Sequence, residues 1–230
     1  MAKYSKRKKD WSKEVSREQK VTLDEAIALC KKYASTTFGE RLDVSIRLGI
    51  DARKSDQNVR GSVVLPHGTG KTLTVAVFAK GDKEKEALDA GADFVGGDDL
   101  AEKFAAGWSD VDRVVATPDM MAVVGKIGKL LGPKGLMPNP KTGTVTADVA
   151  HAISQIKKGQ VQFRNDKGAN IHCTLGLMSF EASQLVDNLT AVIETLVKLK
   201  PSNAKGTYIK GISINSTQGP GVRVDENMFR

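Results

Sequence analysis

The pattern of apolar residues changes twice along this chain, and that change limits the folds open to it. From Leu42 to Ile50, apolar and polar residues alternate strictly, which predicts a strand with one face in the core and one in water. Similar alternation returns after Gly159. Between these segments, residues 73–78 (LTVAVF) are apolar almost throughout, as in a strand covered on both faces. The sequence therefore predicts two kinds of sheet in one chain.

The middle of the chain predicts a small Rossmann-like domain. Strands and helices alternate there, in the order expected for parallel strands joined by right-handed crossovers. The expected strands are 73–78, 93–95 and 113–116, and the expected helices are 82–90, 100–106, 119–131 and 147–158.

The two ends predict elements of an α+β domain. Thr22 and Glu25 have the spacing of a capping box, so a helix should follow directly. Residues 161–175 predict an antiparallel hairpin with one apolar and one polar face. Residues 180–199 predict a long amphipathic helix that ends before Pro201.

Neither end alone has enough elements for a good core. We therefore expect a mixed fold, α/β and α+β: residues 1–66 and 160–230 build one discontinuous two-layer α+β domain, and residues 67–159 are the inserted Rossmann-like domain. The expected hinge residues between the two are Pro66, Gly68, Gly70 and Gly159.

Residues 125–145 (GKIGKLLGPKGLMPNPKTGTV) contain five glycines, three prolines, four lysines and no acidic residue. Gly132-Pro133 should end the preceding helix, because proline lacks an N–H group and restricts the residue before it. We expect a rigid loop with exposed backbone amides, a surface that suits phosphate oxygens. A solvated loop that only connects two elements is the alternative. The unpaired lysines would be Lys126, Lys129, Lys134 and Lys141.

The formal net charge of +8 is distributed unevenly. Residues 67–159 hold 12 basic and 12 acidic residues, whereas the two ends together hold 23 basic and 15 acidic ones. Basic ends favour a polyanionic partner, most often a nucleic acid. Because only 5% of residues are aromatic, recognition of a folded RNA by its shape and backbone fits better than extended base stacking.

Several classes of protein are disfavoured. No apolar run approaches the roughly 20 residues of a membrane helix, and the basic N-terminus lacks the apolar stretch of a signal peptide. Cys30 and Cys173 lie in apolar patterns, as reduced core residues of a cytosolic protein do. The three histidines show no ligand spacing, so we expect no metal and no cofactor.

The segment 67–72 (HGTGKT) ends like a nucleotide-binding P-loop, and a nucleotide hydrolase is the alternative function. The full P-loop pattern needs a glycine five residues before Gly70, where Leu65 stands. It also needs a helix after the loop, whereas residues 73–78 predict a strand. We therefore expect that the protein is not an enzyme and has no catalytic residue. A DNA-binding domain is also disfavoured, because no helix-turn-helix or zinc signature is present.

Six segments carry a family resemblance: residues 48–71, 91–97 (GADFVGG), 125–145, 162–172 (QFRNDKGANIH), 204–214 (AKGTYIKGISI) and 216–224 (STQGPGVRV). Together they resemble the bacterial branch of the L-one family of large-subunit ribosomal proteins, and the resemblance extends over nearly the whole chain. The resemblance implies a two-domain, cytoplasmic protein that binds large-subunit ribosomal RNA and forms the mobile stalk beside the exit-tRNA site. It also implies a role in the release of deacylated tRNA and repression of its own operon through the messenger leader. The expected state is a monomer within the ribosome, with no membrane contact.

The resemblance also implies contact residues. Those expected to contact RNA are Phe38, Glu40, Arg164, Asp166, Lys167, Gly168, His172, Thr217, Gln218 and Gly219. The chain departs from the family pattern twice, with Thr36-Thr37 where lysine is common and Gln218 where methionine is usual. The four lysines of residues 125–145 are then interpreted as a secondary surface for RNA or tRNA. The main RNA site is expected in the basic ends of the chain, whereas this loop lies in the neutral middle.

Overall fold

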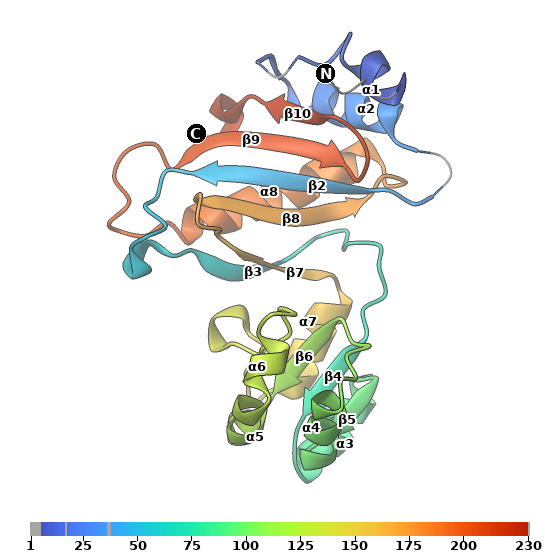
Figure 1. Cartoon of the computed structure of the whole chain (residues 1–230), viewed down its shortest axis with the longest axis vertical. Helices are drawn as coiled ribbons and strands as arrows, with labels where there is room; N and C mark the ends of the chain where they lie inside the picture. Colours follow the sequence, from blue (N-terminus) through green and yellow to red (C-terminus); the bar gives the residue numbers. More distant parts are fainter. Residues whose placement is uncertain (1–5, 17, 36–37, 230) are drawn as a thin grey trace. The chain divides into compact units, whose positions relative to one another are not determined.

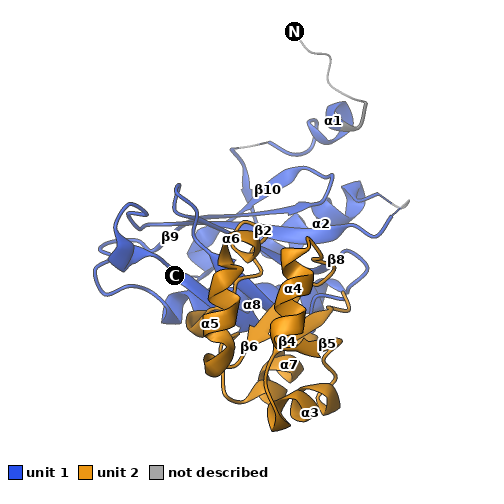
Figure 2. Ribbon diagram, turned by 60° about the horizontal axis from the view of Figure 1, so that its bottom comes forward, with its two compact units in different colours: residues 1–70, 161–230 blue, residues 71–160 orange. Residues whose placement is uncertain are grey.

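The computed structural model describes residues 6–16, 18–35 and 38–229. The chain divides into two compact units (Figure 2). Unit 1 comprises residues 1–70 and 161–230, and unit 2 comprises residues 71–160.

Unit 1 is built around a five-stranded sheet with the order β1-β10-β9-β2-β8 (Figure 1). These strands are β1 Lys20–Val21, β2 Arg41–Leu48, β8 Asn170–Leu177, β9 Ile209–Ser216 and β10 Gly221–Val224. β1 runs parallel to β10, and the other neighbours are antiparallel. A second sheet joins β3 Arg60–Val64 to β7 Gln160–Arg164. The helices are α1 Lys6–Trp11, α2 Leu23–Tyr33 and α8 Ala182–Lys198, with short 3-10 turns at Ser55–Gln57 and Glu226–Phe229.

The strict alternation of β2 places Leu42, Val44, Ile46 and Leu48 in the core of unit 1. The apolar faces of α2 and α8 pack in the same core, so both helices cover one face of the sheet and leave the other open. The predicted capping box is confirmed: Glu25 N donates to Thr22 Oγ1 at 3.4 Å, and Thr22 N donates to Glu25 Oε2 at 3.1 Å.

The predicted hairpin of residues 161–175 is wrong. β7 pairs with β3, whereas β8 pairs with β2, and the two strands meet at an isolated bridge between Asn165 and Ile171. Asn165 explains the exchange of partner, because its N–H donates to Val59 O at 3.0 Å and its Oδ1 accepts from Val59 N at 2.8 Å. The end of β7 is therefore tied to the segment that enters β3.

Unit 2 contains a parallel sheet with the order β5-β4-β6, formed by β4 Val75–Phe78, β5 Phe94–Gly96 and β6 Arg113–Ala116. All four residues of β4 are buried, as predicted for a strand covered on both faces. Val75 and Val77 pack with α3 Asp82–Asp89 and α7 Val149–Lys157. Ala76 and Phe78 pack with α4 Asp98–Ala105 and with the segment after β6.

The helix predicted for residues 119–131 is divided into three pieces. They are a 3-10 turn at Pro118–Met120, α5 Met121–Lys126 and α6 Gly128–Leu131, and a further 3-10 turn follows at Pro140–Thr142. The break is at Ile127, whose N–H bonds to Val124 O in a tightened turn. Gly125 and Gly128 lie on either side of it, and glycine is a poor helix former.

The cysteines are free and buried, in line with the prediction. Burial raises the pKa of each thiol, Cys30 and Cys173, to about 12, so neither is a reactive thiolate at neutral pH. Among the described residues, no cluster of His, Cys, Asp and Glu could hold a metal ion. No described helix is both long and apolar enough to cross a membrane.

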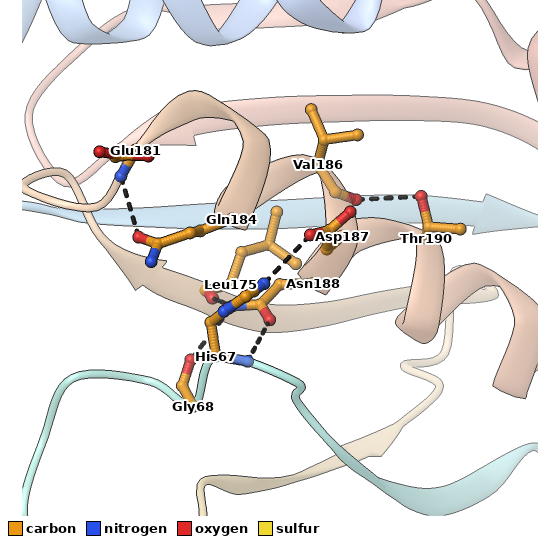
Figure 3. A network of polar contacts seen from close by, with 9 residues as sticks. All are labelled: His67, Gly68, Leu175, Glu181, Gln184, Val186, Asp187, Asn188 and Thr190. Carbon is orange, nitrogen blue, oxygen red and sulfur yellow. Dashed lines mark hydrogen bonds and ion pairs between the residues drawn. The ribbon is translucent and has the colours of Figure 1, made fainter.

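Asn188 determines where the chain leaves unit 1 (Figure 3). This side chain is 0% exposed. Its Oδ1 accepts from His67 N at 3.1 Å, and its Nδ2 donates to Gly68 O at 3.1 Å and to Leu175 O at 2.8 Å. The His67 ring also lies 3.0 Å from Asp187. These contacts hold the segment after Pro66 on α8, so unit 1 extends to Gly70 and not only to Pro66.

On the other side of this joint, Asp112 of unit 2 holds the chain. It forms an ion pair with Lys71 and accepts from Thr74 N at 3.2 Å and from Thr74 Oγ1 at 3.1 Å. Each side of the joint is thus held by contacts within its own unit.

Replacing Asn188 with leucine should destabilise unit 1 by about 2–3 kcal/mol, because the buried carbonyl of Leu175 and the half-buried His67 N–H and Gly68 carbonyl lose their partner. Hydrogen exchange of the α8 amides measures this loss within unit 1. The matched control is Asp187→Asn, an exposed neighbour that contacts the same segment, with an expected change below about 0.5 kcal/mol. Equal effects of the two substitutions would contradict the assigned role of Asn188.

Candidate nucleic-acid interface

The buried carboxylate of Glu40 forms hydrogen bonds to the segments on both sides of the start of β2. It was predicted as a contact, yet the residue is only 2% exposed. Its carboxylate accepts from Ser35 N at 2.6 Å and from Gln218 N at 3.3 Å. A buried carboxylate with these partners positions the backbone on both sides of it and leaves little surface for RNA.

The loop of Thr217, Gln218 and Gly219 is fixed against the start of β2. Thr217 Oγ1 accepts from Arg41 N at 3.0 Å, and Thr217 N donates to Arg41 O at 3.1 Å. Gly219 N donates to Ser216 O at 3.1 Å. Thr217 and Gln218 remain exposed. Phe38 lies just before β2 and is 43% exposed, whereas Thr36 and Thr37 lie outside the described residues.

Asp166 organises the turn at the other end of β2. Its Oδ1 accepts from Gly168 N at 2.8 Å and from Asn170 N at 2.7 Å, and its Oδ2 accepts from Asn170 Nδ2 at 3.2 Å. The hydrogen bonds from Asn170, followed by that from Gly168, lower the pKa of this carboxyl below its usual 3.8. Asp166 therefore remains ionised at neutral pH. The left-handed residue of the turn is Ala169 (φ 62°), not Gly168. Arg164, Lys167 and Gly168 are exposed around it.

The predicted contact residues form two groups at opposite ends of the sheet. Arg41 pairs with Leu177 and Leu42 with Ser216, which places Phe38, Glu40 and the 217–219 loop at the start of β2 (Figure 1). Arg47 pairs with Asn170, which places the Asp166 turn at the end of β2. Because β2 has eight residues, the two groups lie about 25 Å apart. His172, which pairs with Ser45, lies between them.

The open face of the sheet carries basic residues that were not predicted as RNA contacts from the sequence. Arg41 and Arg47 lie on the polar side of β2, and Arg223 lies on β10, opposite Ser213 of β9. All three arginines are exposed. Their positions in the alternating pattern could have identified them, because every second residue of a half-buried strand faces water.

Ser45, His172 and Asp166 have the residue types of a hydrolytic triad. Ser45 Oγ is 2.9 Å from His172 Nδ1, but His172 Nε2 is 3.6 Å from Asp166 Oδ2, which is too long for a hydrogen bond. The backbone of β2 pairs with β8 on one side and β9 on the other, so it has no amides available for an oxyanion hole beside Ser45. The three residues order the polar face and do not form a catalytic site.

The P-loop-like segment does not have the structure of a phosphate cradle. The chain continues from Thr72 into β4 and not into a helix. Lys71, the residue that would contact phosphates, forms an ion pair with Asp112. These contacts disfavour nucleotide hydrolysis.

The 125–145 loop is ordered by its own polar groups. Asn139 O accepts from Thr142 Oγ1 at 3.1 Å and from Thr144 Oγ1 at 3.2 Å, and Asn139 Oδ1 accepts from Lys141 N at 2.8 Å. The amides of Thr142, Gly143 and Thr144 also donate within the loop. The expectation that these amides are exposed for phosphate is therefore wrong, although Lys126, Lys129, Lys134 and Lys141 are all exposed.

The fold defines a mixed α/β protein with one half-open sheet in unit 1 and a parallel sheet in unit 2. The family model of the ribosomal protein L1p/L10e family matches residues 30–220. The large ribosomal subunit protein uL1 of Burkholderia vietnamiensis (strain G4 / LMG 22486) is 55% identical over 226 residues, which cover 98% of this chain and 97% of that protein. The chain belongs to the ribosomal protein L1p/L10e family.

Replacing Gly219 with alanine should distort the 217–219 loop. A Cβ there would lie 2.2 Å from Ser216 Oγ, a buried atom without a hydrogen-bond partner among the described residues. The expected loss in the free energy of unfolding is about 1–3 kcal/mol by chemical denaturation. Gly221→Ala is the matched control, because a Cβ there meets nothing within 4 Å.

The same geometry predicts a rescue. Ser216→Ala removes the clashing oxygen and leaves the Ser216 Cβ at 3.4 Å, an ordinary contact distance. The double variant Gly219→Ala, Ser216→Ala should therefore regain most of the lost stability. Additive effects of the two substitutions would show that the clash is not the cause.

Proposed function

We propose that this chain is a non-enzymatic structural constituent of the large ribosomal subunit, in the cytoplasm, and that it binds ribosomal RNA directly. Membership of the family and the name of the relative support the ribosomal assignment. Unit 1 is the proposed RNA-binding domain. The proposed contacts are Phe38, Arg164, Lys167, Gly168, His172 and the 217–219 loop, with Glu40 and Asp166 as supports for the loops.

The observation that carries this proposal is the open basic face of unit 1 between two fixed loops. Arg41, Arg47 and Arg223 are exposed on this face, and the small side chains of Ser45 and Ser213 lie between them. Arginines neutralise phosphates, and a flat face with small polar groups can approach the 2′-hydroxyls of a shallow RNA minor groove. A face about 25 Å long then recognises the shape of a folded RNA and not one base.

Unit 2 is proposed as the part that acts in the mobile stalk beside the exit-tRNA site and assists the release of deacylated tRNA. Its exposed lysines of the 125–145 loop form the proposed secondary surface for tRNA or for the end of the same RNA. The two crossings near Gly70 and Gly159 serve as the proposed hinge, and both glycines have positive φ. Repression of its own operon through the messenger leader would use the same RNA surface of unit 1.

Titration with the stalk fragment of large-subunit ribosomal RNA tests the surface. Arg47→Gln should weaken binding and reduce the slope of log affinity against log salt by about one, because one phosphate contact is lost. Lys198→Gln is the matched control, since Lys198 is exposed on α8, on the covered side of the sheet. Binding of the parent protein no tighter than to an unrelated RNA hairpin would reject RNA recognition, and equal effects of the two variants would reject the assigned face.

Replacing Lys126, Lys129, Lys134 and Lys141 together with glutamine should leave the affinity for the isolated RNA fragment nearly unchanged. These residues all belong to unit 2, whereas the proposed main contacts belong to unit 1. The same variant should weaken the association of tRNA with reconstituted large subunits. A large loss of affinity for the isolated fragment would move the main site to the 125–145 loop.

A further inference from the structure

A groove next to the 217–219 loop has no role in the surface described so far. Its volume is about 440 Å³, within the range of about 300–1,000 Å³ that is usual for small-ligand sites. One wall is the N-terminal arm, defined as residues 8–15, and the other is the β9–β10 loop. The lining residues are Lys8, Trp11, Ser12, Val15, Gly219, Pro220 and Gly221.

The N-terminal arm is held in place by contacts to the rest of unit 1. Glu14 accepts from Lys32 Nζ through both carboxylate oxygens, each at 2.7 Å. This hydrogen bond is the main cause that lowers the pKa of Glu14. Val15 packs against the core of unit 1. The wall that carries Trp11 is therefore fixed relative to the loop opposite it.

The lining suits a nucleotide. Trp11 provides an aromatic group for a base, Lys8 provides a positive charge for a phosphate, and Gly219 and Gly221 allow close approach of a ligand to the backbone. Ser12 Oγ donates to Lys9 O at 2.9 Å and can still accept a hydrogen bond. Among the described residues that line the groove, none is acidic.

The groove is also continuous with the proposed RNA surface, because Gly219 belongs to both. RNA that lies on Thr217 and Gly219 therefore passes directly beside Trp11. We propose that the groove holds one unstacked nucleotide of the bound RNA, with its base against Trp11 and its phosphate beside Lys8. This inference rests on the proposed function and assigns a site to the N-terminal arm.

Tryptophan fluorescence tests the site in the full-length protein. The chain has two tryptophans, and Trp108→Phe in unit 2 leaves Trp11 as the only one. Titration of this variant with the stalk ribosomal RNA fragment should quench Trp11 in parallel with binding. Adenosine monophosphate alone should not quench at comparable concentrations, and quenching by it would overturn the assignment to a nucleotide of the bound RNA.

Two substitutions separate stacking from packing. Trp11→Leu keeps an apolar side chain but cannot stack, so affinity for the fragment should fall about tenfold, while Trp11→Phe should stay close to the parent. Lys8→Gln should reduce the salt slope more than Lys13→Gln, an exposed lysine of the same arm that does not line the groove.

The outcomes distinguish the two levels of the proposal. If the parent binds the fragment but Trp11 emission and the affinity of Trp11→Leu do not change, the groove is not a nucleotide site and the proposed function stands. If the parent does not bind the fragment, the proposed function and this inference both fail.

Discussion

The arrangement of unit 1 depends on the pairing of β2 on both sides. β8 and β9 occupy its two edges, so the strand cannot slip by one residue without moving every apolar side chain from the core to water. This pairing fixes the distance between the 217–219 loop at one end and the Asp166 turn at the other. A surface that recognises the shape of an RNA needs such a fixed separation, because the partner offers repeated phosphates and few distinctive groups.

Two carboxylates complete this arrangement at the ends of β2. An ionised carboxylate on the proposed RNA-binding face repels phosphates, so its presence there calls for a structural role. Glu40 accepts from backbone amides inside the protein, and Asp166 accepts from the amides of Gly168 and Asn170. Each carboxylate thus supports a loop through backbone N–H groups, beside the exposed side chains of Thr217, Arg164 and Lys167. In the proposed binding, both carboxylates act indirectly, through the shape of the loops.

Local signals in the sequence predicted most individual helices and strands. They did not predict contacts between residues that are distant in the sequence. The capping box at Thr22, the alternation of β2 and the buried run of β4 are local and were confirmed. The partner of β7 depends on the bonds between Asn165 and Val59, which the alternation of β7 does not contain. Likewise, the internal hydrogen bonds of the 125–145 loop and the burial of Glu40 follow from tertiary packing. The alternation of apolar and polar residues in β2 and β10 indicates that Arg41, Arg47 and Arg223 face water. A total charge for the two chain ends does not show which face these residues share.

The distribution of charge agrees with the proposed division of tasks between the two units. Unit 2 is electrically neutral in formal charge, with 12 basic and 12 acidic residues, so the whole excess of +8 belongs to unit 1. Affinity for RNA grows with the number of counterions that basic groups release, and a neutral unit releases few unless its lysines are gathered at one place. In unit 2 that place is the 125–145 loop, whose amides are already bonded within the loop. In the proposed function, these lysines therefore supply a small local share of charge, whereas the arginines and fixed loops of unit 1 supply the main contact.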